Sequence, residues 1–386
     1  MVTFLSFLVL TTTLVMLLAI QKCCGLIKPG HIAAKGARSR LFQRSALFCS
    51  QPNYEDAILQ WSKEPVPRWP DPTAKMGYAY DVTRSYLQDK GVPEADNSAR
   101  YLLCDVANLG YRRTDFHNAL EEGSAKNILS SEQLTMLAKH CLQRADRVPI
   151  QYIIGNWDFY GLTLECRPPV LIPRPETEEL VERVLSSKVL DGCTQPEILD
   201  IGAGTGAIGI AMLAELPTGK ARCTAIDINP VAVELAESNA KNALSASSSS
   251  CYECLHKSFD ELISNGSYEK KFDIIISNPP YIPEDEMREL EPEVGDNEDR
   301  AALYGGEDGL DLVREIITHG HRLLRSSGPG ELWMEVARRH PKMIEEWIKA
   351  LEDQSERKGT EMPKFKFIEG MNDLSGNARF VRLRLR

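Results

Sequence analysis

The chain has 386 residues, which at about 150 residues per domain is enough for two domains. Its composition, with 43% hydrophobic and 26% charged residues, is typical of a globular protein. The formal net charge of −10 argues against a protein that binds nucleic acid over a broad basic surface, although it does not exclude a local basic groove.

The first 51 residues are interpreted as targeting information and not as part of the fold. Residues 4–20 are almost entirely apolar, and residues 22–51 are basic, contain serine and carry no acidic residue. We therefore predict a presequence that directs import into an organelle and is then removed. A plastid is favoured, with a mitochondrion as the alternative. A retained membrane anchor is the rival interpretation, but the apolar run of about 17 residues is at the short limit for a bilayer.

Residues 52–148 are predicted to form a small all-helical domain. Apolar positions recur every three or four residues in segments 78–91, 97–110 and 130–147. Ser130 with Gln133 three positions later is a helix-start signal. The proline-rich stretch 61–72 is predicted to be a surface loop.

Residues 149–175 combine β-branched and aromatic residues with two glycines, which predicts a β-hairpin linking two domains. From residue 176 to 386, apolar strands alternate with helical segments, as in an α/β fold with a mostly parallel sheet covered on both faces. The predicted strands are 197–202, 222–228, 251–257, 272–277, 330–336, 364–369 and 378–385. The predicted helices are 176–190, 207–216, 230–244, 309–324 and 341–351. Because no helix separates the last two strands, an antiparallel hairpin is predicted at that edge.

A glycine-rich turn follows the first strand of this region, in the sequence EILDIGAGTGAIGI. Gly202, Gly204 and Gly206 allow the backbone to approach a ligand closely. Asp227 follows about 20 residues later, where doubly wound folds place the acid that binds a ribose. A dinucleotide fingerprint fits the same residues, so this motif alone is ambiguous. The carboxylate of Asp200 would be unfavourable beside the negative charge of a pyrophosphate. It is more compatible with the cationic centre of S-adenosylmethionine.

The second motif is Asn278-Pro279-Pro280-Tyr281, at the end of the fourth strand. Ligands of open α/β sheets lie beyond the carboxyl ends of the strands, so this segment is expected in the same crevice as the glycine loop. The Asn278 side-chain oxygen and the Pro279 carbonyl are two acceptors that can orient a planar amino or amide group toward a methyl donor. The two prolines stiffen the backbone, and Tyr281 offers a flat face to the substrate.

These motifs in this order resemble the class I methyltransferases that act on planar amino or amide groups. Residues 149–182, residues 278–311 and the terminal NARFVRLRL narrow the resemblance to the HemK/PrmC family of release factor glutamine methyltransferases. The resemblance implies a helical N-terminal domain, a β-hairpin link and a Rossmann-like catalytic domain with a seven-stranded sheet. It also implies S-adenosylmethionine as cofactor and, as substrate, the glutamine in a Gly-Gly-Gln loop of a peptide-chain release factor.

The resemblance assigns roles to individual positions as well. The residues that it implies for cofactor binding are Gly202, Ala203, Gly204, Thr205, Gly206, Asp227, Phe259 and Asn278. The residues that it implies around the glutamine are Asn278, Pro279, Pro280 and Tyr281, and the catalytic ones among them are Asn278, Pro279 and Tyr281. Phe259 is expected beside the adenine, and Arg174 and Glu176 either shape the lid of the site or have a structural role. No metal site is expected, because Cys251 and Cys254 form a single CxxC pair.

Three alternatives stay open. A DNA or RNA adenine amino-methyltransferase would also use Asn-Pro-Pro-Tyr, but it calls for a basic groove and for aromatic stacking on the flipped base. A dehydrogenase would leave Asn-Pro-Pro-Tyr unexplained. A non-catalytic module that only binds a release factor predicts that a change of Asn278 leaves function intact. We expect instead an enzyme that acts as a monomer, binds a release factor and contacts neither nucleic acid nor, once mature, a membrane.

Overall fold

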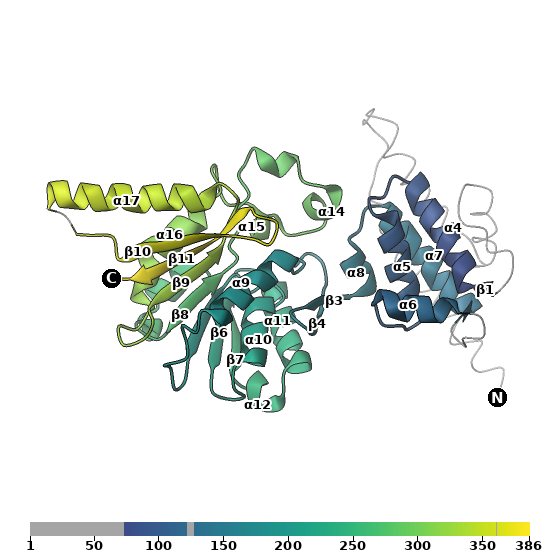
Figure 1. Cartoon of the computed structure of the whole chain (residues 1–386), viewed down its shortest axis with the longest axis horizontal. Coiled ribbons are helices and arrows are strands. Elements are labelled where there is room, and N and C mark those ends of the chain that lie inside the picture. Colours follow the sequence, from purple (N-terminus) through teal and green to yellow (C-terminus); the bar gives the residue numbers. More distant parts are fainter. Residues whose placement is uncertain (1–72, 122–126, 360) are drawn as a thin grey trace, which may run out of the picture. The chain divides into compact units, whose positions relative to one another are not determined.

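A computed structural model describes residues 73–121, 127–359 and 361–386 of the chain (Figure 1). The predicted presequence and the predicted proline-rich loop lie outside these residues. Labels of helices and strands follow Figure 1, in which the described elements begin with β1 and α4. None of the helices in the described ranges has both the length and the apolar character of a membrane span.

The N-terminal part is helical, as predicted. Its helices are α4 (Met76–Asp89), α5 (Ala95–Val106), α6 (Arg113–Leu120) and α7 (Ser131–Ala145), with a short antiparallel pair of β1 (Ala74–Lys75) and β2 (Ile128–Leu129). The predicted helix start at Ser130 is confirmed. Ser130 Oγ accepts from the Gln133 backbone N–H at 3.3 Å, and the Gln133 side chain accepts from the Ser130 N–H at 2.8 Å, which is a capping box.

The hairpin is shorter than the predicted range 149–175. A single helical turn, α8 (Ile150–Ile154), comes first, and the antiparallel strands β3 (Asn156–Phe159) and β4 (Leu162–Glu165) follow. Pro149 precedes the turn and Gly155, at a φ of 78°, ends it, so local capping overrides the strand preference of the β-branched residues. The two prolines at 168 and 169 lack N–H donors and cannot extend the strand ladder.

The rest of the chain is built on a seven-stranded sheet in the order β10-β11-β9-β8-β5-β6-β7. The strands are β5 (Glu197–Ile201), β6 (Arg222–Asp227), β7 (Tyr252–His256), β8 (Ile274–Ser277), β9 (Glu331–Glu335), β10 (Phe365–Asn372) and β11 (Ala378–Leu385). Strands β5 to β9 run parallel, and β11 is antiparallel to both of its neighbours. This confirms the α/β fold class and the predicted antiparallel edge.

Helices cover both faces of the sheet (Figure 1). One face packs on α9 (Pro175–Ser186), α10 (Ala207–Glu215) and α11 (Pro230–Ala243), and the other on α13 (Phe259–Ser264), α16 (Asp311–His319) and α17 (His340–Lys358). Successive residues of a strand point to opposite faces of the sheet. Ile198 packs in the core with α9, α10 and α11, and Leu199 packs in the core with α13, α16 and α17. The remaining short helices are α12 (Ala246–Ser249), α14 (Pro292–Gly295) and α15 (Arg300–Leu303), with 3-10 turns at Gly266–Tyr268, Glu286–Arg288 and Gly320–Arg322.

A buried carboxylate fastens the antiparallel edge to the parallel strands. The side chain of Glu331 on β9 is 1% exposed. It accepts hydrogen bonds from Arg382 Nη2 at 2.8 Å, Arg384 Nη2 at 2.6 Å and Trp333 Nε1 at 3.0 Å. Strand β11 is thereby held against β9 by charge as well as by the backbone ladder.

Glu331→Ala is expected to lower the free energy of unfolding by about 3 kcal/mol, because it removes the partner of two arginines at a largely buried position. Urea unfolding monitored by circular dichroism measures the loss. Glu269→Ala is the control, since its pair with Arg322 is exposed on both sides and should contribute less than about 1 kcal/mol. Equal losses in the two variants would contradict this account of the sheet edge.

Candidate active site

An open pocket lies beyond the carboxyl ends of β5, β6, β7 and β8. The chain continues from β5 to one side of the sheet and from β8 to the other, so the strand order reverses between these two neighbours. The pocket is lined by the loops that follow the strands, at Gly202 and Gly204, at 227–229, at 257–260, and at Asn278 and Pro280. The two motifs expected from the sequence therefore meet at one crevice.

The glycine loop takes backbone conformations that favour glycine. Gly202 has a φ of 80° and Gly204 a φ of 55°, in the left-handed region. A Cβ atom on Gly202 would lie 3.7 Å from the backbone carbonyl oxygen of Asn278, so the loop runs directly beside the second motif. The Gly204 N–H donates to Asp227 Oδ2 at 2.8 Å, which holds the loop against the end of β6.

Asp227 faces the pocket with spare acceptor capacity. Its Oδ1 accepts from the Asn229 N–H at 2.8 Å, and its Oδ2 accepts from Gly204. Burial raises the pKa of this carboxyl, and hydrogen bonds from backbone N–H groups, those of Asn229 and Gly204 among them, oppose the shift. Because an ionised carboxylate has about four lone-pair sites, each oxygen can accept a further hydrogen bond from a ligand hydroxyl.

Asp200 does not face the pocket. Its carboxylate is fully buried under α10, where Oδ2 accepts from the Gly209 N–H at 3.1 Å and Oδ1 has no hydrogen-bond partner in the described part of the chain. Desolvation raises the pKa of Asp200 to about 7. The prediction that Asp200 suits the cationic centre of S-adenosylmethionine is therefore wrong, because Asp200 does not line the pocket. Residue alternation along β5 places Asp200 on the face of Ile198, beneath α10.

The structure brings some of the expected site residues to the pocket and not others. Those on its lining are Gly202, Gly204, Asp227, Phe259, Asn278 and Pro280. Those that do not line it are Ala203, Thr205, Gly206, Pro279 and Tyr281. Phe259 is only 4% exposed and packs in the core beside α16, whereas the neighbouring Ile228, which sequence reasoning missed, is 55% exposed on the lining.

A second glycine-containing loop holds the Asn-Pro-Pro-Tyr turn. The backbone of Ile282 pairs with Leu303 and Gly305, through hydrogen bonds of 2.9 Å in each direction. A Cβ on Gly305 would lie 2.7 Å from the Pro280 carbonyl oxygen, and a Cβ on Gly309 would clash with the Tyr281 carbonyl oxygen. The segment 301–311 is therefore packed directly against the backbone that carries the motif.

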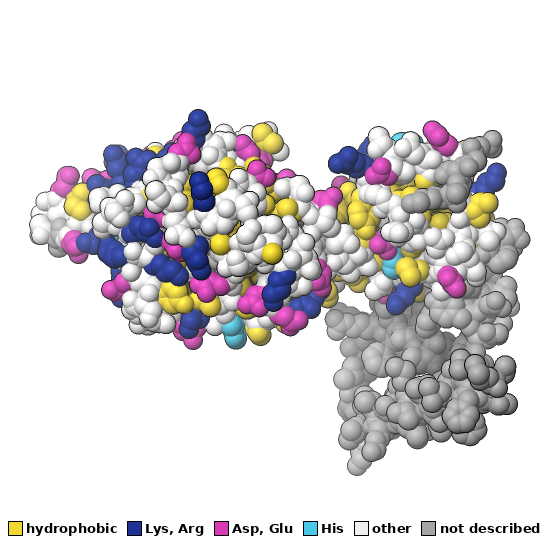
Figure 2. Space-filling model, turned by 90° about the horizontal axis from the view of Figure 1, so that it is seen from below, with side chains coloured by type: hydrophobic (Ala, Val, Ile, Leu, Met, Phe, Trp, Pro, Cys, Tyr) yellow, Lys and Arg dark blue, Asp and Glu magenta, His cyan; other side chains and the backbone are white. Residues whose placement is uncertain are grey.

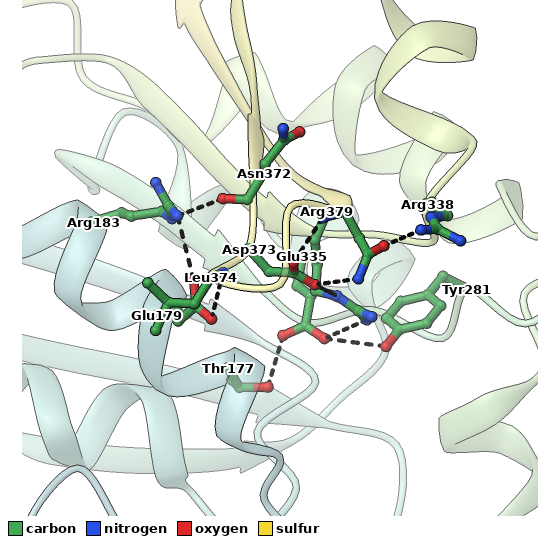
Figure 3. A network of polar contacts seen from close by, with 11 residues as sticks. Thr177, Glu179, Arg183, Tyr281, Glu335, Arg338, Asn372, Asp373, Leu374 and Arg379 are labelled. Atoms are coloured by element: carbon green, nitrogen blue, oxygen red, sulfur yellow. Dashed lines mark hydrogen bonds and ion pairs between the residues drawn. The ribbon is translucent and has the colours of Figure 1, made fainter.

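A buried carboxylate lies behind the turn (Figure 3). Glu335, at the end of β9, accepts from Thr177 Oγ1 at 2.7 Å and from the Tyr281 hydroxyl at 3.1 Å, and it lies 3.8 Å from Arg379 Nη1. Burial raises the pKa of both Glu335 and Tyr281. The side chain of Tyr281 is thus tied through its hydroxyl to the interior. Thr177 also accepts from Asn278 Nδ2 at 3.1 Å.

The segment after the turn is held by arginines. Arg174 donates to both carboxylate oxygens of Glu298, at 2.8 and 2.6 Å, and the Glu298 side chain is almost fully buried. On α7, Arg144 donates to Glu293 at 2.8 Å. For Arg174 either a role in shaping the lid of the site or a structural role was expected. The structure shows a structural contact, with Glu298. Glu293, which stands in a stretch rich in acidic residues, therefore pairs with an arginine of its own chain.

Four residues of this arrangement were missed from the sequence: Thr177, Glu298, Asp299 and Glu335. Asp299 lines the pocket and accepts from Asn229 Nδ2 at 2.7 Å. Glu335 carries the signal that identified Asp227, an acid at the carboxyl end of an apolar strand. Glu298 and Asp299 stand in a run of acidic residues, where no local pattern separates them from their neighbours.

The charge of the pocket is mainly acidic. Its charged lining residues are Asp227, Lys257, Asp260, Asp299 and Glu315. Figure 2 shows one face of the described chain, on which Lys and Arg side chains gather over the sheet-containing part with Asp and Glu side chains among them. An acidic pocket rim repels a phosphate backbone, which speaks against a duplex nucleic acid at this opening.

Comparison with known proteins gives a consistent result. The family model "Methyltransferase small domain" matches residues 179–290, and "PrmC N-terminal domain" matches residues 79–155. The Homo sapiens protein named MTRF1L release factor glutamine methyltransferase is 32% identical over 340 residues, which are 85% of this chain and 92% of that protein. Release factor glutamine methyltransferases of Geobacter sulfurreducens and Streptococcus pneumoniae are each 36% identical, over 64% and 68% of this chain and 80% and 88% of theirs.

Gly309→Ala is expected to displace the Tyr281 carbonyl and to lower both the melting temperature and methyl-transfer activity, because the added methyl group has no room and φ is 82°. Gly219→Ala is the matched control, with a φ of 71° and no neighbour within 4 Å. Thermal unfolding and activity assays separate the two. An activity loss in Gly219→Ala as large as in Gly309→Ala would contradict the packing argument.

The buried Asp200 predicts a pH dependence of stability. Between about pH 4 and pH 7 the folded chain retains a proton that the unfolded chain has released, so this contribution falls as the pH rises and is lost above the folded pKa of about 7. In Asp200→Asn, urea midpoints at pH 5 and pH 8 should differ less than in the wild type. The exposed Asp191→Asn should keep the wild-type difference. An unchanged difference in Asp200→Asn would refute the assignment.

Proposed function

The chain belongs to the family of release factor glutamine methyltransferases, and we propose that it methylates the glutamine in the Gly-Gly-Gln loop of an organellar peptide-chain release factor. The methyl group goes from S-adenosylmethionine to the side-chain amide nitrogen. One observation carries the proposal: the glycine loop at Gly202 lies beside the backbone of Asn278. A loop suited to a nucleoside and a motif suited to a planar nitrogen thus share one crevice.

The pocket residues fit S-adenosylmethionine. Because Gly202 and Gly204 have no side chains, the pocket stays open where their Cβ atoms would lie. Asp227 has lone pairs left to accept hydrogen bonds from the two ribose hydroxyls. Ile228 and the edge of Phe259 offer apolar surface for the adenine. When bound, this cofactor supplies a methyl group on a positively charged sulfur.

The Asn-Pro-Pro-Tyr residues orient the acceptor. An amide nitrogen is a weak nucleophile, because its lone pair is delocalised into the carbonyl. The Asn278 side-chain oxygen and the Pro279 carbonyl accept its two hydrogens and direct the lone pair along the line of attack. Pro280 and the ring of Tyr281 frame the planar group. No general base is required, because the proton leaves after the methyl group has been transferred, so the catalysis is by positioning and preorganised electrostatics.

We extend the proposal to the organisation of the chain. Residues 52–148 bind the release factor, residues 149–175 link the two domains, and residues 176–386 carry the chemistry. The matches of the two family models to the N-terminal and C-terminal parts support this division. Residues 1–51 direct import into a plastid, with a mitochondrion as the alternative, and the mature enzyme acts as a monomer away from membranes and nucleic acid.

The test is an assay of the full chain with labelled S-adenosylmethionine and an organellar release factor, with duplex DNA as a second substrate. Mass spectrometry should locate the methyl group on the glutamine amide of the Gly-Gly-Gln loop. Asn278→Ala should lower the turnover number by about 100-fold or more and leave release factor binding intact. Asn265→Ala, an exposed amide on the surface, should retain activity.

Three results would contradict the proposal. Label on the adenine of the DNA would favour the amino-methyltransferase alternative. Full turnover in Asn278→Ala would remove Asn278 from the chemistry, and release factor binding without methyl transfer by the wild type would indicate a binding module.

A further inference from the structure

Asn278 heads a chain of hydrogen bonds that runs into the interior. Its Nδ2 donates to Thr177 Oγ1 at 3.1 Å, and the Thr177 hydroxyl donates to Glu335 Oε2 at 2.7 Å. Thr177 and Glu335 are both buried, whereas Asn278 is half-buried on the pocket lining. The path therefore connects a pocket residue to a carboxylate that water does not reach.

The position of Thr177 follows from its helix. Helix α9 begins at Pro175, a residue with a preset helical φ, and carries Glu176 and Glu178 in its first turn, where acids complement the helix dipole. Thr177 stands between these acids and faces inward, toward the ends of β8 and β9. A hydroxyl in the first turn of α9 is thus held between the two strand ends.

The carboxylate sets the direction of the hydrogen bonds. The Tyr281 hydroxyl donates to Glu335 Oε1 at 3.1 Å and the Arg379 guanidinium lies 3.8 Å away, and both oppose the rise in the pKa of Glu335 that its burial causes. The single hydrogen of the Thr177 hydroxyl is donated to Glu335 Oε2, at 2.7 Å. The Thr177 oxygen can then only accept from the other side.

That direction decides which end of the Asn278 amide faces Thr177. Only the Nδ2 end can donate to the Thr177 oxygen, so the amide oxygen is turned the opposite way. No hydrogen bond to Asn278 Oδ1 occurs within the described residues, whereas Nδ2 is engaged. The acceptor end of the amide is therefore left for a ligand.

We propose that Thr177 and Glu335 are positioning residues that hold the Asn278 amide with its oxygen toward the nitrogen that is methylated. The inference rests on the proposed function, because that nitrogen must carry hydrogens for Oδ1 to accept. A reversed amide would set the Asn278 NH₂ group against the substrate NH₂ group, donor against donor. We call the hydrogen-bonded chain Asn278–Thr177–Glu335 the relay. The relay favours a substrate with a planar nitrogen that carries N–H groups over a group that only accepts hydrogen bonds.

Thr177→Val tests the relay, because valine has nearly the same shape and neither donates nor accepts a hydrogen bond. We expect its turnover number on release factor to fall about 100-fold, while the dissociation constant for S-adenosylmethionine changes by less than about threefold. Thr177→Ser keeps the hydroxyl and should restore turnover. Thr224→Val is the matched control, since Thr224 is also buried and donates to a glutamate, Glu253, at 2.9 Å, on β6 away from the pocket.

A second readout does not depend on turnover. With selective ¹⁵N labelling of asparagine, the side-chain amide signal of Asn278 is assigned by its absence in Asn278→Ala. In the wild type and in Thr177→Ser its protons should exchange slowly with water, and in Thr177→Val they should exchange faster and shift upfield. Glu335→Gln should also perturb this signal, because a glutamine amide at that position can donate or accept and no longer fixes the direction.

The outcomes separate this inference from the proposed function. Wild-type methylation of the glutamine with an unchanged turnover number and an unchanged Asn278 signal in Thr177→Val would overturn the relay alone. Absence of methylation by the wild type would overturn the proposed function, and the Asn278 signal would still decide the orientation of the amide. Loss of turnover in Thr224→Val as large as in Thr177→Val would assign the effect to general destabilisation and count against the relay.

Discussion

The carboxylate of Glu335, at the end of β9, is the group on which three other segments of the structure converge. It has no exposure to solvent, and its burial raises its pKa, while donors from the protein oppose the shift. The donors come from the first turn of α9, from the turn after β8 and from β11, through Thr177, Tyr281 and Arg379 (Figure 3). The satisfaction of one buried charge thereby fixes the distances between the elements that surround the pocket.

Contacts around Glu335 hold the two motifs of the site in fixed positions. The Asn-Pro-Pro-Tyr turn is held by the hydrogen bond of Tyr281 to Glu335 and by the packing of the second glycine-containing loop, at Gly305 and Gly309. The cofactor side is held by the bond between Gly204 and Asp227. No histidine is among the described residues that line the pocket. The arrangement agrees with a reaction whose main demand is to hold a weakly nucleophilic nitrogen in line with a methyl group.

The parts of this arrangement that local sequence determines were predicted, and the parts that depend on distant pairing were not. All seven strands and the glycine loop follow from apolar runs and from glycines at fixed spacing. The hairpin was overextended because Pro149 and Gly155 cap a helical turn within a segment of strand-favouring residues. Helix α17 runs on to Lys358, beyond the predicted end at 351, because the helix is stopped only by Gly359.

The site shows the same division. Asp227 and Asn278 were found because Asp227 ends an apolar strand and Asn278 directly follows one. Thr177 and Glu335 are 158 positions apart in the chain, and no local pattern reports that they touch. For Asp200 the alternation of residues along β5 already assigns the face beneath α10, so its position away from the pocket follows from a local pattern.

The central claim is that one crevice aligns a glutamine amide with the cofactor through acceptors of fixed direction. A crystal structure of the full chain with S-adenosylhomocysteine and a Gly-Gly-Gln peptide tests it most directly. The account predicts the glutamine nitrogen at about 3 Å from both Asn278 Oδ1 and the Pro279 carbonyl oxygen, with Asn278 Nδ2 still on Thr177. A glutamine bound outside this crevice, or an Asn278 amide with its nitrogen toward the glutamine nitrogen, would contradict it.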